Sequence, residues 1–173
     1  EFLAFIEASP VADKIDRFTE GMRAEGNGRL DLELDMPLRH VLDTAIRGAF
    51  QFQNNQVHVV PGLPPVGQVN GRLNITATTI TAQEITGQIL GGPMRLSVRN
   101  DGDRVAVTLA GTASLREARK HFDTRVFDHL AGSTPWKGEV RVRKKNADFV
   151  VESNLVGISS SLPEPFNKTA ATV

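Results

Sequence analysis

Four residues with metal-binding side chains lie close together in the second half of the chain. They are His121, Asp123, Asp128 and His129. Imidazole and carboxylate groups are common zinc ligands, but this spacing matches no zinc motif, and the neighbouring Lys120 and Arg125 would oppose a bound cation. We interpret the group as the solvated surface of a helix, so the sequence predicts neither a metal nor another cofactor.

Two further segments share only their composition with catalytic motifs. Gly91-Gly92-Pro93 lacks the lysine and the strand-turn-helix setting of a phosphate-binding loop, and we interpret it as a bulge or a sharp bend in a strand. Ser159-Ser160-Ser161 has no GxSxG setting and no partnered histidine nearby in sequence. We therefore expect that the chain is not an enzyme.

The charge distribution argues against nucleic acid as a partner. The chain has 20 Lys+Arg and 20 Asp+Glu residues, so its formal net charge is zero and no global field attracts it to an anionic polymer. A basic strip is formed by Arg141, Arg143, Lys144 and Lys145, but it has no interleaved aromatic residues. A charged strand edge that discourages edge-to-edge pairing explains this strip better.

Length and composition are those of one domain. The 173 residues are enough to bury a core of ordinary size. The chain has no cysteine, no signal peptide and no apolar run of the roughly 18 residues that a membrane span needs, and it begins at Glu1. We expect residues 1–173 to be a single soluble segment of a longer protein.

A long apolar face dominates the middle of the chain, from Val69 to Val98. Apolar residues alternate there with polar ones, which predicts a sheet that is wet on one side only. The same alternation occurs at Leu30, Leu32 and Leu34. The fold class is therefore mainly β with a few short helices (α+β), and its sheet is antiparallel.

Turn and cap signals divide the chain into elements. Ser9-Pro10 begins an amphipathic helix that packs on the sheet, Asn54-Asn55 forms the tip of a hairpin, and Ser114 with Glu117 matches a capping box. The predicted order is a helix over residues 10–23, a β-meander over 26–111, a helical insert over 114–131, a β-hairpin over 136–155 and an extended tail over 159–173. A short repeat, NGRLDL at 27–32 and NGRLNI at 70–75, suggests one strand environment used twice.

Several local motifs together resemble the large AsmA-like periplasmic proteins, and most closely the YhdP family. They are Gly26 to Leu32 with Leu34 and Pro37-Leu38, Val69 to Leu73, Ile89 to Pro93, Ser153 to Gly157, and Leu162 to Lys168. The motifs cover almost the whole chain in the expected order. Phe166 stands where such proteins often have leucine.

The resemblance implies a curved, extended one-sided sheet, a β-groove, in the periplasm of a Gram-negative bacterium. The segment would belong to a long protein anchored in the inner membrane, in contact with adjacent segments of the same protein and, through other parts, with the inner and outer membranes. Phospholipid acyl chains would be its ligands. The expected groove wall consists of Leu30, Leu32, Leu34, Phe50, Phe52, Leu73, Ile75, Ile85, Ile89, Met94, Leu96 and Val98.

Two functions remain open at this point. The segment either conducts phospholipid along an open apolar groove, or it is a structural or protein-interaction module of the envelope with a closed core. An apolar face that is open favours the first function, and a face filled by other side chains favours the second.

Overall fold

A computed structural model of the chain describes residues 22–35, 45–59, 62–76, 78–101, 104–143 and 146–171. Its elements are, in order, β1 (Arg23–Asp35), β2 (Ala45–His58), β3 (Val66–Thr76), β4 (Ile80–Ile89), β5 (Gly92–Asp101), β6 (Arg104–Ser114), α3 (Leu115–His121), the 3-10 helix η2 (Arg125–His129), β7 (Leu130–Arg143), β8 (Asn146–Glu152) and β9 (Ile158–Ser160). The prediction of a mainly β fold is confirmed.

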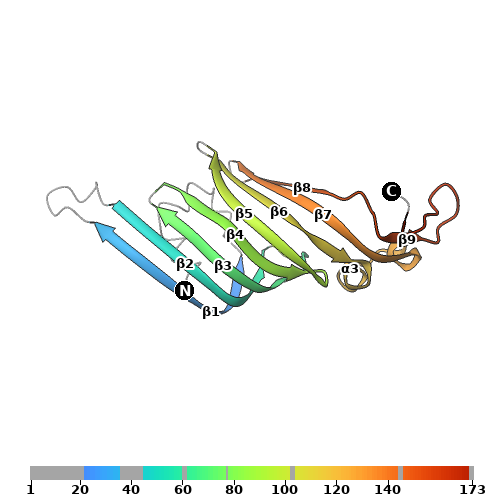
Figure 1. Cartoon of the computed structure of the whole chain (residues 1–173), viewed down its shortest axis with the longest axis horizontal. Coiled ribbons are helices and arrows are strands. Elements are labelled where there is room, and N and C mark those ends of the chain that lie inside the picture. The colour runs from blue at the N-terminus through green and yellow to red at the C-terminus, as the bar shows by residue number, and fades with distance from the viewer. Residues whose placement is uncertain are drawn as a thin grey trace.

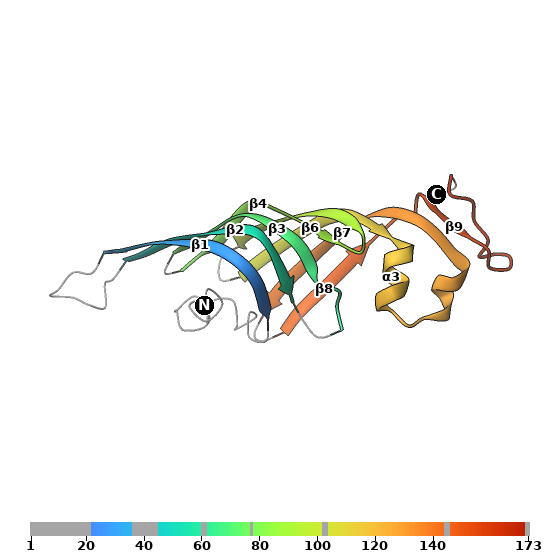
Figure 2. The ribbon, with the colours of Figure 1, turned by 90° about the horizontal axis from the view of Figure 1, so that it is seen from below.

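The strands form one antiparallel sheet in which neighbours in sequence are neighbours in space. β1 to β8 lie in chain order, and β9 pairs with β7 (Figure 1). β8 pairs with residues 137–143 of β7 and β9 with residues 130–132, so both occupy the same side of β7. Figure 2 shows that the sheet is strongly bent, with α3 projecting from it beside the end of β6.

The predicted alternation sorts side chains onto two faces. In β3, Val69, Leu73 and Ile75 are buried, whereas Asn70 and Arg72 between them are exposed. We call the side of the sheet that carries Val69, Leu73 and Ile75 the apolar face, and the side that carries Asn70 and Arg72 the polar face. The sheet is therefore one-sided, as the sequence predicted.

Bulges interrupt the pairing of β1 to β4 and bend these strands. The register shifts between Glu25 and Asn27, between Phe52 and Val57, and between Gly67 and Asn70. A bulge adds a residue to one strand and increases its local bend. The pairings β5–β6, β6–β7 and β7–β8 show no such shift.

The hairpin predicted at Asn54-Asn55 is wrong. β2 continues through both residues, and Asn54 has a φ of 55° at a bulge. Asn55 is 3% exposed; its Oδ1 accepts a bond of 2.7 Å from the Gln53 N–H, and its Nδ2 donates one of 3.2 Å to the Glu25 carbonyl. Asparagine tolerates the left-handed region in turns and in bulges alike, so the residue type does not distinguish them.

The sequence repeat places two strands symmetrically about β2. Gly28 and Gly71 both pair with Phe52, and Leu30 and Leu73 both pair with Phe50. The two copies thus flank one strand in matching register. Their environments differ, because β1 is the edge strand, where Leu32 is 42% exposed, whereas its counterpart Ile75 in β3 is 2% exposed.

Several turn and helix predictions need adjustment. At Gly91-Gly92-Pro93 the chain makes a two-residue turn, Leu90-Gly91, between β4 and β5, with φ values of 51° and 73°, and not a bulge. Helix α3 starts after Ser114 as predicted, but the Ser114 side chain makes no capping hydrogen bond. The second short helix is the 3-10 helix η2.

Two further predictions concern the segments near the ends of the chain. The helix predicted over residues 10–23 lies outside the described residues except for its end, where Arg23 already belongs to β1. The tail predicted as extended contains strand β9, and Ser160 forms a β-bridge with Lys168. The division of the chain into segments otherwise stays a prediction.

Candidate apolar binding face

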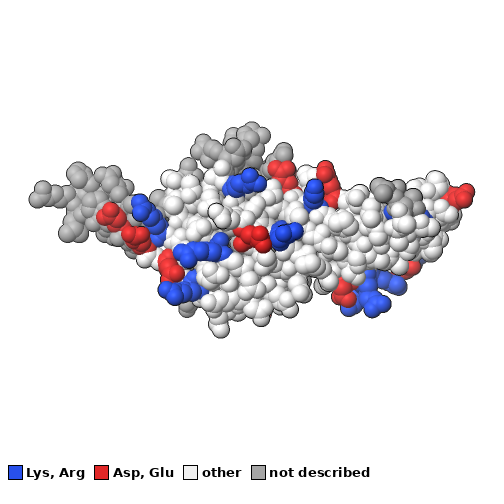
Figure 3. All heavy atoms as spheres, in the orientation of Figure 1, with Lys and Arg blue, Asp and Glu red and all other residues white. Residues whose placement is uncertain are grey.

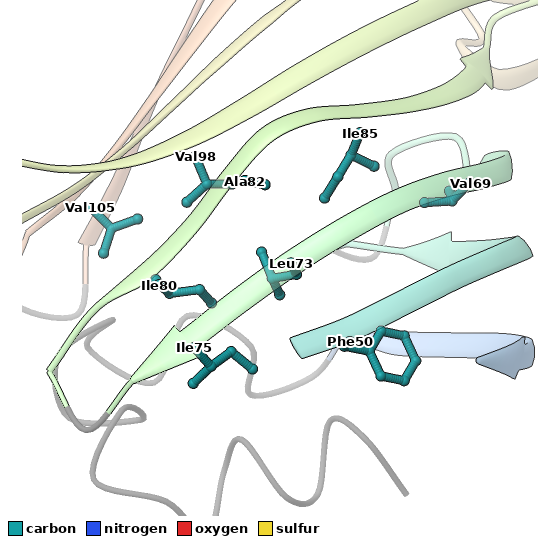
Figure 4. Packing of buried hydrophobic residues seen from close by; sticks show 9 residues of the cluster. All are labelled: Phe50, Val69, Leu73, Ile75, Ile80, Ala82, Ile85, Val98 and Val105. Atoms are coloured by element: carbon teal, nitrogen blue, oxygen red, sulfur yellow. The ribbon is translucent and has the colours of Figure 1, made fainter. Parts of the chain in front are cut away.

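The apolar face carries a continuous cluster of buried side chains. Its buried members are Phe50, Val69, Leu73, Ile75, Ile80, Ala82, Ile85, Val98 and Val105. Figure 4 shows that they come from successive strands and lie beside one another along the sheet. Ile75 and Ala82, each 2% exposed, are the most buried of them. The cluster therefore extends across the strands, from β2 to β6.

Large side chains of this face lie over glycines of neighbouring strands. The ring of Phe50 occupies the place where a Cβ on Gly28 would be. A Cβ on Gly71 would lie 2.9 Å from Cα of Ile85, and one on Gly111 would lie 3.1 Å from the indole of Trp136. Close packing needs partner atoms on every side. Because glycine has no side chain, these positions leave room within the sheet for the large side chains of neighbouring strands.

The predicted wall residues have three kinds of environment. Six are buried, namely Phe50, Leu73, Ile75, Ile85, Met94 and Val98; Leu30, Phe52, Ile89 and Leu96 are half-buried; and Leu32 is 42% exposed. The side chain of Leu34 lies outside the described part. Eight of the twelve are in the cluster or packed against it, and Leu32, Ile89, Met94 and Leu34 are not among these.

The strand register adds apolar residues to this face beyond the twelve predicted from the sequence. One unbroken cross-strand row consists of Ala82, Val98, Val107, Val140 and Phe149, and a second of Ile85, Leu96, Leu109, Gly138 and Val151. The alternation in β6 and β7 was visible in the sequence. The register that joins those strands into rows was not.

Exposure rises steeply where these rows reach β8. Val140 of β7 is 7% exposed, but Phe149, its partner in β8, is 47% exposed, and Val151 is 68% exposed. Val150, which points to the polar face, is 52% exposed. The apolar face thus carries buried side chains from β2 to β7 and is open to solvent at β8.

The charged residues near α3 are engaged with one another. Asp128 forms a 2.6 Å ion pair with Arg119, and Lys120 donates to Glu117 at 2.7 Å. This hydrogen bond from Lys120 lowers the pKa of the Glu117 carboxyl. Within the described residues, no group of three or more histidine, aspartate and glutamate side chains is arranged to hold a metal ion.

These observations define a class of protein. It is built on an open antiparallel sheet that has a polar face and an apolar face, and the apolar face ends uncovered at β8. The model of the YhdP protein family matches residues 1–173, and the chain therefore belongs to the YhdP family.

A curated relative gives this family a biochemical context. The chain is 25% identical over 181 residues to the intermembrane phospholipid transporter YhdP of Escherichia coli (strain K12). The alignment covers 96% of this chain and 14% of that relative. No solved structure matches the chain.

Among the helices of the described residues, none has the length and apolar character that crossing a membrane requires.

Proposed function

We propose that this chain is a non-enzymatic segment of a cell-envelope bridge protein that shelters phospholipid acyl chains on its apolar face. Membership of the YhdP family and the name of the E. coli relative support lipid as the ligand. The parent protein would be anchored in the inner membrane, would hold this segment in the periplasm, and would reach both membranes through other parts.

One observation carries the proposal, namely the two apolar rows that cross from β4 to β8 without a charged residue. A chain of about sixteen methylenes gains on the order of ten kcal/mol on leaving water, at ~0.8 kcal/mol per CH₂. Along an uninterrupted apolar path the acyl chain stays out of water at every position. A charged side chain would break this path. The open end at Phe149 and Val151 is where an acyl chain would first meet the face.

The burial of the wall supports a second function. Ile75, Ile85 and Met94 are at most 4% exposed, so a ligand could contact them only if the atoms that cover them moved away. A structural or protein-interaction module of the envelope has such a closed core and binds no lipid. The two functions differ in what contacts the β8 end of the apolar face.

Photo-crosslinking from adjacent positions of β8 separates these functions. A benzophenone amino acid is placed at Val151, on the apolar face, or at Val150, on the polar face, within the full-length parent protein in cells. Both positions are exposed, so both tolerate the probe. We expect lipid adducts at Val151 and few at Val150. Adducts to protein alone at Val151 would favour the structural module.

A charged substitution in one of the two apolar rows tests phospholipid transport itself. Leu96→Asp in the full-length protein places a carboxylate in the middle of the second row, and desolvation of that charge opposes passage of an acyl chain. We expect loss of phospholipid transport, with Ser97→Asp on the polar face as the matched control. Retained transport by a folded Leu96→Asp protein would contradict the proposal.

A further inference from the structure

The polar face carries an open hollow of about 1190 Å³ across β4 to β8. Part of its lining is one cross-strand row in continuous register, Thr86, Arg95, Ala110, Lys137 and Glu152. Two residues further along β5, β6 and β7, Pro93, Thr112 and Pro135 also line it, as does Asn154, two residues past the end of β8. Two neighbouring rows with the same alternation thus bound the hollow.

The hollow opens on the polar face and not on the apolar face. Between the two rows lie residues of the apolar face, and of these Met94 is 3% exposed and Gly87 is buried. Gly111, Trp136, Val151 and Ser153 complete this set, so six of the fifteen lining residues belong to the apolar face and nine to the polar face. Arg95 and Lys137 are exposed, as are Thr86 and Glu152. In Figure 3 the face of the sheet turned toward the viewer carries both signs of charge.

Two cations stand on either side of a small residue in this row. Arg95 and Lys137 are each in register with Ala110, so their Cα atoms are about two strand spacings, roughly 10 Å, apart. Both side chains are long enough to reach a group bound above Ala110. The ion pairs of the described residues, Arg29–Asp31, Arg119–Asp128 and Lys120–Glu117, involve neither cation.

We propose that this hollow binds the phosphate group of a phosphodiester, with Arg95 and Lys137 as its cationic ligands. Guanidinium offers a planar fork for two phosphate oxygens, and the ammonium of lysine adds a point charge. The hydroxyl of Thr112 and the amide of Asn154 supply neutral donors on the second row. With Glu152 the row has a net charge of +1, which matches the single negative charge of a phosphodiester.

The site is distinct from the apolar rows, because Arg95, Ala110 and Lys137 lie on the opposite face of the sheet, and Val151 is the one residue of those rows that belongs to its lining. The phosphodiester is either the headgroup of a phospholipid or a soluble ester. Nothing in the proposed function requires it, and its loss would leave the apolar rows intact.

NMR titration of the ¹⁵N-labelled 173-residue chain tests the site at named amides. The probes are dimethyl phosphate, dihexanoyl phosphatidylglycerol and uncharged trimethyl phosphate. We expect the amides of Ala110 and Thr112 to shift with the anionic probes and not with trimethyl phosphate. Shifts with both anionic probes identify a general phosphodiester site, and shifts with the lipid alone identify a headgroup site.

Variants decide whether the two cations hold the ligand. Arg95→Gln with Lys137→Gln should weaken binding at least about tenfold, because charge-assisted hydrogen bonds become neutral ones. Ala110→Leu should weaken it similarly by filling the centre of the hollow, while Arg72→Gln, an exposed arginine outside the hollow, should leave it unchanged. No shift with either anionic probe, equal shifts with trimethyl phosphate, or unchanged affinity in the double variant would overturn the proposal.

Discussion

The two halves of this sheet differ in how far their apolar side chains are buried. In the bent half, β1 to β4, every pairing contains a register shift, and most of the core cluster lies there. In the regular half, β5 to β8, the pairings run without a shift, and apolar residues become exposed at the last strand. Bulges and side-chain burial thus coincide.

The reason is geometric. A flat sheet leaves the side chains of one face parallel, and each is covered only on its flanks. Bulges bend the strands, so side chains on one face converge and cover one another. Phe50 over Gly28 shows how close this approach becomes. The bent half carries most of the buried cluster, whereas the apolar rows of the regular half stay buried at Val98 and Val140 and become exposed at Phe149 and Val151 of β8.

The largest difference between the halves should appear when core volume is removed. Ile75→Ala in the bent half removes a side chain that is 2% exposed and should lower the free energy of unfolding by about 2–5 kcal/mol. Val151→Ala in the regular half removes one that is 68% exposed and should change it by less than about 0.5 kcal/mol. Urea unfolding followed by circular dichroism measures both. Equal effects would show that the halves do not differ in packing.

The one-sided pattern of each strand was predictable, because alternation depends on nearest neighbours in sequence. Leu73 and Ile75 were placed correctly on the apolar face for this reason. The bulge at Asn54 was not predictable, since asparagine with a positive φ serves turns and bulges equally. Register is a long-range property as well, so the row that ends at Phe149 could not be found from the sequence.

The candidate site was predictable in composition but not in exposure. Ten of the twelve wall residues are buried or half-buried, yet the sequence does not say what covers Ile75. The hollow around Ala110 could not be predicted from the sequence for another reason. Arg95 and Lys137 are 42 positions apart and meet only through the pairing of β5, β6 and β7.

A second test removes the polar support of the bulges in the bent half. Asn55, which is 3% exposed, bonds to the Gln53 N–H and the Glu25 carbonyl, so Asn55→Ala leaves both without their side-chain partner and should cost about 1–3 kcal/mol of unfolding free energy. Asn70→Ala breaks two bonds of 2.9 Å, to the Asn54 N–H and the Gln68 carbonyl, at an exposed site, where water replaces the amide. Its cost should stay below about 1 kcal/mol. Thermal or urea unfolding gives both values, and a larger loss for Asn70→Ala would argue against this account of the bend.

A third test compares two single glycines, one from each half, that differ in the space around an added Cβ. A methyl group on Gly111, in the regular half, would lie 2.7 Å from the carbonyl oxygen of Pro93, so Gly111→Ala should destabilise by about 1–2 kcal/mol. Gly67, in the bent half, has nothing within 4 Å of a Cβ. Gly67→Ala should therefore stabilise by up to about 1 kcal/mol, because it reduces the entropy of the unfolded chain. Urea midpoints of the two variants show whether their changes in unfolding free energy have opposite signs, as expected. Destabilisation of similar size at both sites would remove the distinction.

The smallest effect is expected at Trp136, where two contributions oppose each other. Its Nε1 is buried and has no hydrogen-bond partner in the described part of the chain. Trp136→Phe removes this unsatisfied N–H, which is worth about 1–3 kcal/mol, but also removes apolar area over Gly111 that is worth a similar amount. The net change in unfolding free energy should lie within about 1 kcal/mol. Trp136→Ala, which removes the ring as well, should cost about 3–5 kcal/mol. A loss above about 2 kcal/mol for Trp136→Phe would mean that the indole N–H stabilises the fold, and the packing of the regular half would then depend on a polar contact as the bent half depends on Asn55.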